Sequence, residues 1–326
     1  MWETDRRLFI GLLSILAWPG VTSAQQDGFP DRPIRLIVPN PPGGPSDIAA
    51  RFLGEPMRSN LGQAMIIDNR PGAAGMIGTM AAVHAPADGY TVLVTSRSNH
   101  IIAPLIQKNG QFEPQRDLLP VGMALKAVGL FVVNSQTPFK SLKDLVGYAR
   151  ANPGKLNYGS AGVGATNHIA MEQFKALAGV DLVHVPYKGA GPMITGLMGG
   201  EVQLSLLDFA SAQSGLRSGT LRPLAQTGSR RHSTMPELPT LAETGFADYD
   251  PSFWIGLAVP RGTPGPIVLR LNQALNAAVS DVQLKARAQV NGWELVGGAP
   301  QLLANAVAKD LVDYGGLIQK LGIKSM

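Results

Sequence analysis

The sequence predicts an α/β protein of two lobes, with a ligand cleft between the lobes and two hinge crossings. Strand-like apolar runs alternate with amphipathic helical segments along most of the chain. This alternation starts twice, once near residue 34 and again near residue 129. The 326 residues include 38 glycines and 25 prolines, which stand mostly between the periodic segments. Glycine and proline in these positions are typical of a fold with many short connections.

The first series begins with an apolar strand at 34–39, which ends at the sequence Pro-Pro-Gly-Gly. A helix is expected from about 45 to 60, because apolar residues recur there on one helical face. The later elements are a strand at 64–68, a helix at about 75–85 and a strand at 91–95. Alternation of this kind predicts a largely parallel sheet covered by helices.

The second series begins with a strand at 130–133 and a helix at 141–151, where Ser141 and Asp144 have the spacing of a capping box. A strand at 156–158 precedes a helix at 165–178, which Gly179 ends. The remaining strands are expected at 183–186, 202–207, 221–225 and 252–259, and only helical patterns follow, at 267–280 and 302–321.

These last helices need a surface to pack on, and the economical arrangement returns the chain to the first lobe. The two crossings are expected near residues 125–130 and near 250. The predicted divisions are 1–24 as a signal peptide, 25–127 as the first part of lobe 1, 128–250 as lobe 2, and 251–326 as the return to lobe 1 with a helical C-terminus.

The N-terminus has the pattern of a secretion signal. Arg6 and Arg7 precede an apolar stretch at 8–21, and Thr-Ser-Ala at 22–24 resembles a cleavage site. The apolar stretch is too short to span a membrane. An uncleaved anchor or a buried helix is the alternative interpretation.

Composition excludes several function classes. The formal net charge is +5, and no run of lysine or arginine is long enough to indicate nucleic-acid binding. The chain has no cysteine, which excludes thiol catalysis and cysteine-based metal sites. The five histidines lack the spacings of a zinc motif, so no metal or other cofactor is predicted.

The first glycine loop, "PNPPGGPSD", places Gly43 and Gly44 directly before a helix start. Pro45 suits the first helical position, and Asp47 lies in the first turn, where the helix dipole favours an acid. Backbone amides beside a helix N-terminus form an anion site. A tight strand–helix turn is the alternative, because glycine is common there.

The second glycine loop, "NYGSAGVGATNH", also lies between a strand and a helix. It is not a P-loop, because Ala165 stands where the phosphate-binding lysine is needed, and Asn167 breaks the Rossmann pattern. What remains is a set of backbone amides with the hydroxyls of Ser160 and Thr166, which could hold a carboxylate. Two such loops facing each other across a cleft would bind a small anion.

The other polar candidates have structural interpretations. Arg70, in a third glycine-rich junction, could reach an anion or cap a carbonyl, and the structural role is favoured. Lys188 is expected to be solvated. Asp47 and Arg51 have the spacing of a surface ion pair on a helix. His168 has no catalytic partner in the sequence, so we expect it to be a structural residue and the protein not to be an enzyme.

Six blocks of the sequence resemble one family in its order, from about Phe29 to Asn276: "RPIRLIVPNPPGGPSDIAAR", "IDNRPGAAGMIGT", "PADGYTVLV", "LNYGSAGVGATNHIAMEQFKALAG", "HVPYKGAGP" and "PTLAETG". They resemble the substrate-binding proteins of tripartite tricarboxylate transporters, the Bug family of periplasmic receptors. The resemblance implies a type II periplasmic-binding-protein fold. The implied ligand-binding residues are Pro42, Gly43, Gly44, Asp47 and Ser96 in lobe 1, and Ser160, Ala161, Gly162, Gly164, Thr166 and His168 in lobe 2, with Tyr187 and Asp208 as further cleft residues.

The resemblance also implies a monomeric receptor in the periplasm, which delivers a small carboxylate to the membrane subunits of a tripartite tricarboxylate-type transporter. Dicarboxylates, tricarboxylates, acidic amino acids and aromatic acids all stay open. Asn40, the segment 97–104 and Leu207 depart from the family pattern, so the ligand cannot be copied from a relative. The alternatives are a subunit that presents its ligand to a membrane sensor kinase and, from another class, a cleft hydrolase.

Overall fold

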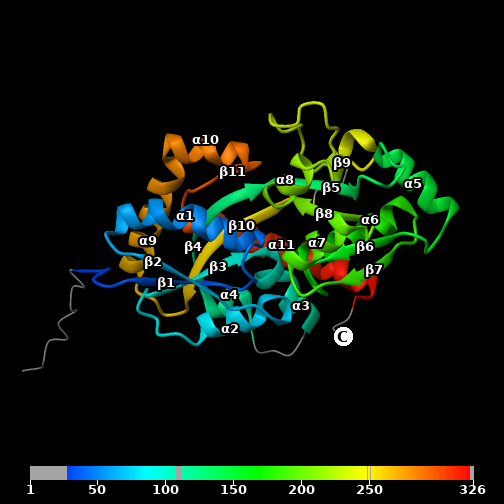
Figure 1. The fold of residues 1–326 in the computed structure, drawn as a ribbon. Helices are drawn as coiled ribbons and strands as arrows, with labels where there is room; N and C mark the ends of the chain where they lie inside the picture. The colour runs from blue at the N-terminus through cyan, green and yellow to red at the C-terminus, as the bar shows by residue number, and fades with distance from the viewer. Residues whose placement is uncertain (1–27, 108–111, 248, 250, 324–326) are drawn as a thin grey trace, which may run out of the picture.

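Two β-sheets, each packed against helices, form the two lobes (Figure 1). The computed structural model describes residues 28–107, 112–247, 249 and 251–323, so the predicted signal peptide lies outside the described residues. The fold class predicted from the sequence, an α/β protein with two lobes, is confirmed.

The first sheet has six strands in the order β11-β4-β10-β3-β1-β2. These strands are β1 (Ile34–Val38), β2 (Met65–Asn69), β3 (Thr91–Ser96), β4 (Leu118–Ala127), β10 (Phe253–Pro260) and β11 (Trp293–Leu295). β1 pairs in parallel with β2 and β3, but β10 runs antiparallel to β3 and β4, and β11 antiparallel to β4. The parallel arrangement predicted from the first three strands is therefore confirmed for β1, β2 and β3, but the complete sheet is mixed, because β10 and β11 run antiparallel to their neighbours.

The second sheet has five strands in the order β7-β6-β8-β5-β9. They are β5 (Gly129–Asn134), β6 (Asn157–Ser160), β7 (Val183–Pro186), β8 (Leu204–Asp208) and β9 (Leu221–Gln226). β6 is parallel to β7 and β8, whereas β5 is antiparallel to β8 and β9. This sheet is mixed as well.

The helices are more numerous than the sequence patterns indicate, and β11 interrupts the region where only helical patterns were expected. Those between strands of the first sheet or after them are α1 (Pro45–Leu61), η1 (Ala73–Gly75), α2 (Met76–Val83), the π-helix η2 (Arg97–Ile102), α3 (Ala103–Gln107), α4 (Pro114–Asp117), α9 (Gly265–Ser280), α10 (Val282–Val290) and α11 (Pro300–Leu321). Those of the second lobe are α5 (Leu142–Ala151), α6 (Thr166–Ala178), α7 (Ala190–Gly199), α8 (Phe209–Arg217) and η3 (Ala242–Thr244). Among the described helices, none has the length and apolarity needed to cross a bilayer.

Each lobe has its own apolar core, as expected of a unit that packs by itself. In the first lobe, the ring of Phe52 on α1 meets the ring of Trp293 on β11 edge-on at 5.0 Å between centroids. In the second lobe, Phe131 on β5 packs against Phe174 on α6 at 4.7 Å. These cores hold fixed the loops that face the other lobe.

The chain passes between the sheets at two neighbouring places. β4 ends at Ala127 and β5 starts at Gly129, while the return strand β10 begins at Phe253. The amide of Gly129 donates to Oγ1 of Thr227 at 2.7 Å, and the hydroxyl of Ser252 donates to the same oxygen at 3.2 Å. We propose that the chain divides into lobes at these hydrogen-bonded crossings.

A small apolar cluster joins the lobes on the side of the C-terminal helix. It consists of Ile102 on η2, Ile106 on α3, Ile169 on α6 and Ile318 on α11, all buried. Because Ile169 belongs to the second lobe and Ile102 and Ile106 to the first, this isoleucine cluster is an interlobe contact.

Candidate functional site

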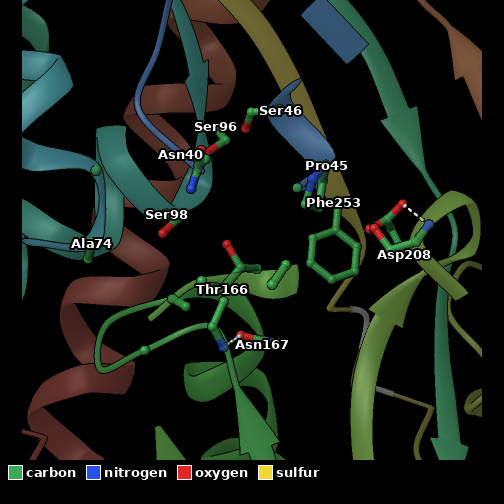
Figure 2. A pocket seen from close by; sticks show the side chains of 18 of the residues that line it. Asn40, Pro45, Ser46, Ala74, Ser96, Ser98, Thr166, Asn167, Asp208 and Phe253 are labelled. Atoms are coloured by element: carbon green, nitrogen blue, oxygen red, sulfur yellow. Dashed lines mark hydrogen bonds between the residues drawn. The ribbon is translucent and has the colours of Figure 1, made fainter. Parts of the chain in front are cut away.

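A pocket of about 630 Å³ lies between the lobes, and elements of both lobes line it (Figure 2). This volume is typical of a small-molecule site. The segments that contribute to its lining are 39–46, 71–75, 96–98, 161–167, 186–190, 206–211, 253–255 and the isolated residues Leu125, Ala127, Met193 and Trp293.

The first wall is the loop between β1 and α1. Gly44 is the N-cap of α1 in an extended conformation, with φ −81° and ψ 168°, and Pro45 follows as the first helical residue. Since the first amides of a helix have no acceptor within the helix, the turn at Ser46 presents donors at the pocket. A Cβ at Gly44 would lie 4.0 Å from Cβ of Ala190, on the other lobe.

Asp47 does not line the pocket but holds this loop from below. Its carboxylate accepts hydrogen bonds from the amide of Gly43, the guanidinium of Arg51 and the side chain of Asn69, each at 3.0 Å. Burial alone would raise the pKa of Asp47, but these hydrogen bonds keep it below its usual value. The predicted ion pair of Asp47 with Arg51 is confirmed.

A second helix start of the first lobe faces the same space. Ser96, at the end of β3, caps η2 through a capping box with Asn99, whose Oδ1 accepts from the amide and the hydroxyl of Ser96. Figure 2 shows Asn40, Ser96 and Ser98 on this side of the pocket. Asn40 and Ser98 were not among the predicted site residues.

The second lobe contributes the glycine loop between β6 and α6. Its amides are largely satisfied within the chain: Ala161 N–H donates to Asn167 Oδ1 at 3.2 Å, Gly162 N–H to Ser160 Oγ at 3.2 Å and Gly164 N–H to His168 Nδ1 at 3.3 Å. The pocket instead meets the start of α6, where Thr166 and Asn167 face the polar residues of the first lobe (Figure 2).

A stack of rings supports this loop from behind. His168 and His184 stack at 4.2 Å between centroids, Tyr158 stacks on His184 at 4.8 Å, and Nε2 of His184 lies 2.6 Å from the hydroxyl of Ser160. Burial lowers the pKa of His168, and burial together with the charge of His168 lowers the pKa of His184 to about 4. Both imidazoles are therefore neutral at pH 7, and Nδ1 of His168 can accept from Gly164.

The contact of Ser160 with His184 has the form of a nucleophile and its base, but it lacks the chemistry of one. Ser160 is 0% exposed and does not line the pocket. An imidazole with a pKa of about 4 is a poor general base at neutral pH. Within the described part of the chain, no group of acidic and histidine side chains has the geometry of a metal site.

The other end of the pocket is apolar apart from the carboxyl group of Asp208 and the hydroxyl group of Ser211. Its lining includes Leu207, Phe253, Trp254 and Trp293 around Asp208, which is 2% exposed. Asp208 caps α8 by accepting from the amide of Ser211 at 3.1 Å. Burial raises its pKa, although the hydrogen bonds of this helix start oppose the effect.

Two cationic side chains also reach the lining. The guanidinium of Arg97 binds Asp310, donates to the carbonyl of Ser252 and lies over the ring of Tyr314. Lys188 is exposed at the rim. Among the described residues, the one largely buried cation of the lining, Arg97, is thus already engaged by Asp310.

Of the predicted site residues, Gly44, Ser96, Ala161, Gly162, Thr166, Tyr187 and Asp208 line the pocket. The others lie behind it: Pro42, Gly43, Asp47, Ser160, Gly164 and His168. The residues that sequence reasoning missed are Asn40, Ser46, Ser98, Asn167, Ser211, Phe253, Trp254 and Trp293. Arg70 donates to the carboxylate of Asp68, and not to a carbonyl as favoured from the sequence.

Comparisons with known proteins give one consistent answer. The family described as "Tripartite tricarboxylate transporter family receptor" matches residues 49–323. Protein BugT of Bordetella pertussis is 32% identical over 320 residues, which cover 98% of this chain and 98% of BugT. A Rhodopseudomonas palustris protein solved with adipate is 33% identical with a TM-score of 0.88, over 91% of this chain and all of that chain. MatC from the same species, with bound malate, is 30% identical with a TM-score of 0.84, over 89% of this chain and all of that chain.

Proposed function

This chain belongs to the tripartite tricarboxylate transporter receptor family, a family of solute-binding proteins, and we propose that it captures a small carboxylate between its lobes in the periplasm. It would then deliver this ligand to the membrane subunits of a tripartite tricarboxylate-type transporter. Both steps are binding events, so the protein itself catalyses no reaction. The hydrolase alternative is not supported, because the structural neighbours are solute-binding proteins.

The observation that carries the proposal is the convergence of helix N-termini on one pocket. α1, η2 and α6 all begin at its lining, at Pro45, Arg97 and Thr166. Helix starts carry free amides and partial positive charge, so they attract an anion without a dedicated arginine. Each is worth about 0.3–1 kcal/mol at an exposed site and up to about 2 kcal/mol when partly buried, and charge-assisted hydrogen bonds add to this.

The predicted site residues then take two roles. Those that line the pocket, together with Asn40, Ser46, Ser98 and Asn167, would contact the ligand. Those behind it set the shape of the two loops: Asp47 holds Gly43, and His168 holds Gly164. The ligands of the neighbours, adipate and malate, are small carboxylates and are consistent with this class.

The test is thermal unfolding of the protein, after bound ligand has been removed by unfolding and refolding, against a panel of small carboxylates. A ligand at one hundred times its dissociation constant adds about 2.7 kcal/mol of stability, and each kcal/mol raises the midpoint by about 2–4 °C at this size. A panel without any shift would refute the carboxylate class.

A matched pair of variants tests the position of the site. Gly44→Val places a side chain between the first loop and Ala190 of the other lobe, and the backbone at Gly44 is one that valine adopts. Gly265→Val is the control, because Gly265 also begins a helix, is exposed and meets no atom within 4 Å. We expect Gly44→Val to lose the ligand-induced shift and Gly265→Val to keep it. Equal shifts in both would place the site elsewhere.

A further inference from the structure

The pocket has one carboxyl group at its apolar end, and we propose that Asp208 selects a ligand with a positively charged amine at the end opposite its carboxylate. This inference rests on the proposed function, since it assumes that a carboxylate occupies the helix N-termini. It names the class of solute more narrowly: an amine-terminated monocarboxylate, with an apolar body, is favoured over a dicarboxylate.

Asp208 is held in a fixed place. It is the last residue of β8 and pairs in register with Gly129, the first residue of β5 at the hinge. The next residue, Phe209, donates its amide to the carbonyl of Val128 at 3.0 Å. One carboxyl oxygen, Oδ1, accepts from Ser211 N–H, which fixes the side chain as the cap of α8. A group anchored in this way can discriminate between ligands by position.

The charge of Asp208 is offset by hydrogen bonds at the start of α8, from Ser211 and the neighbouring amides, but not by a cationic side chain of the described residues. No ion pair of the described residues includes Asp208, although it is 2% exposed. Figure 2 shows Phe253 next to it on the pocket side, and Leu207 and Trp254 belong to the same lining. A buried carboxylate is costly unless it is paired. A ligand amine would supply the missing partner.

A dicarboxylate would place its second carboxylate near Asp208, and no free cationic side chain of the described lining is there to bind it. Arg97 is already bound to Asp310 and to the carbonyl of Ser252, and Lys188 is exposed at the rim. A second carboxylate next to Asp208 would bring like charges together in an apolar space, unless one of them took up a proton. The polar groups Asn40, Ser96, Ser98, Thr166 and Asn167 gather away from Asp208, at the helix starts (Figure 2).

The experiment compares ligands that differ only at the far end. Calorimetry on the ligand-stripped protein would use hexanedioate, 6-aminohexanoate and hexanoate, and then the rigid set terephthalate, 4-(aminomethyl)benzoate and 4-methylbenzoate. The variant is Asp208→Asn, because asparagine also caps helices and keeps the oxygen that accepts from Ser211. The control is Asp281→Asn, since Asp281 caps α10 in the same way, through Leu284 N–H at 2.7 Å, outside the pocket.

The wild type and Asp281→Asn should bind the amine of at least one set about tenfold or more tighter than the corresponding dicarboxylate, as expected for a buried charge pair. Asp208→Asn should lose this preference while still binding the apolar monocarboxylate. A dicarboxylate that binds best to the wild type, or an amine preference unchanged in Asp208→Asn, would overturn the inference and leave the proposed function standing. If no compound of either set binds, the inference fails, and the thermal-unfolding panel of small carboxylates decides the proposed function separately.

Discussion

Replacing Asp310 with asparagine should destabilise the folded protein by about 3 kcal/mol, because the change removes the carboxylate that balances the charge of Arg97. Oδ2 of Asp310 accepts from Nε of Arg97 at 2.8 Å and from Nε1 of Trp254 at 2.7 Å. The pair links η2, whose start lines the pocket, to the C-terminal helix α11. The prediction therefore concerns the support of the binding site as well as the fold.

The magnitude follows from burial. The side chains of Arg97 and Asp310 are 13% and 11% exposed. Removing one partner of a buried pair costs about 3–5 kcal/mol, because a buried charge then remains without its counter-charge. We expect the lower end of this range, since asparagine can still accept from Trp254 and a little solvent reaches both groups.

Urea unfolding at pH 7 would measure the effect, with Asp313→Asn as the control. Asp313 lies one turn further along α11 and pairs with Lys309, and these side chains are 49% and 75% exposed. Exposed pairs contribute about 0–1 kcal/mol, so the control should differ little from the wild type. Equal losses in the two variants would refute the reasoning. The double variant Arg97→Met/Asp310→Leu should recover much of the stability, since apolar residues can replace a buried pair at little cost.

Two further predictions concern the loss of stability at low pH and the close approach of the two lobes at Gly189. Burial lowers the pKa of His100 to about 4. Between about pH 6.5 and pH 4, His100 therefore binds a proton in the unfolded chain but not in the folded protein. Stability should therefore fall as the pH drops from about 6.5 to about 4, by about 3 kcal/mol for this histidine, and urea unfolding of His100→Gln should show a smaller fall. An equal fall in the variant would contradict this. Gly189→Ala should weaken ligand binding, because a Cβ there would lie 2.7 Å from Cγ of Pro41 on the opposite lobe. Gly219→Ala is the control, because Gly219 also has a positive φ, +70° against +114° at Gly189, and a Cβ there would meet no atom within 4 Å. Equal affinities of the two variants in calorimetry would show that Gly189 does not limit closure.

Signals that depend on neighbouring residues were read correctly from the sequence. The capping box of α5 forms as predicted, with Asp144 N–H donating to Ser141 Oγ at 3.1 Å and Ser141 N–H to Asp144 Oδ2 at 2.9 Å. Gly179 ends α6 in the left-handed conformation, and Pro45 takes the first turn of α1. Each of these outcomes is decided within four or five residues, so a single sequence contains the information.

Strand direction could not be read in the same way. β4 and β10 are antiparallel neighbours although their centres are far apart in the chain, and β11 is only three residues long. Pairing of this kind is decided by where the chain crosses between lobes, which leaves no local pattern. The three residues of β11 are too few to show a strand periodicity.

The site was predicted in part for a related reason. Both glycine loops reach the pocket, because a strand–loop–helix junction is a local signal. The direction of each loop amide is not a local signal. Gly164 N–H donates to His168, and the position of His168 is set by its stacking on His184 in the folded protein. Trp254 and Trp293 come from the two strands that flank the end of β4 at the hinge, and their sequence context indicates only burial.

The isoleucine cluster should slow the opening of the cleft, and with it the escape of any bound solute. Opening the cleft would bring side chains such as Ile102 and Ile169 into water, at a cost of about 1.5–3 kcal/mol for each one fully exposed. This cost is the same whichever solute occupies the pocket. Each 1.4 kcal/mol of it that remains in the barrier to opening would slow escape about tenfold. The pocket would then decide which solutes are held, and the cluster how long every one of them stays.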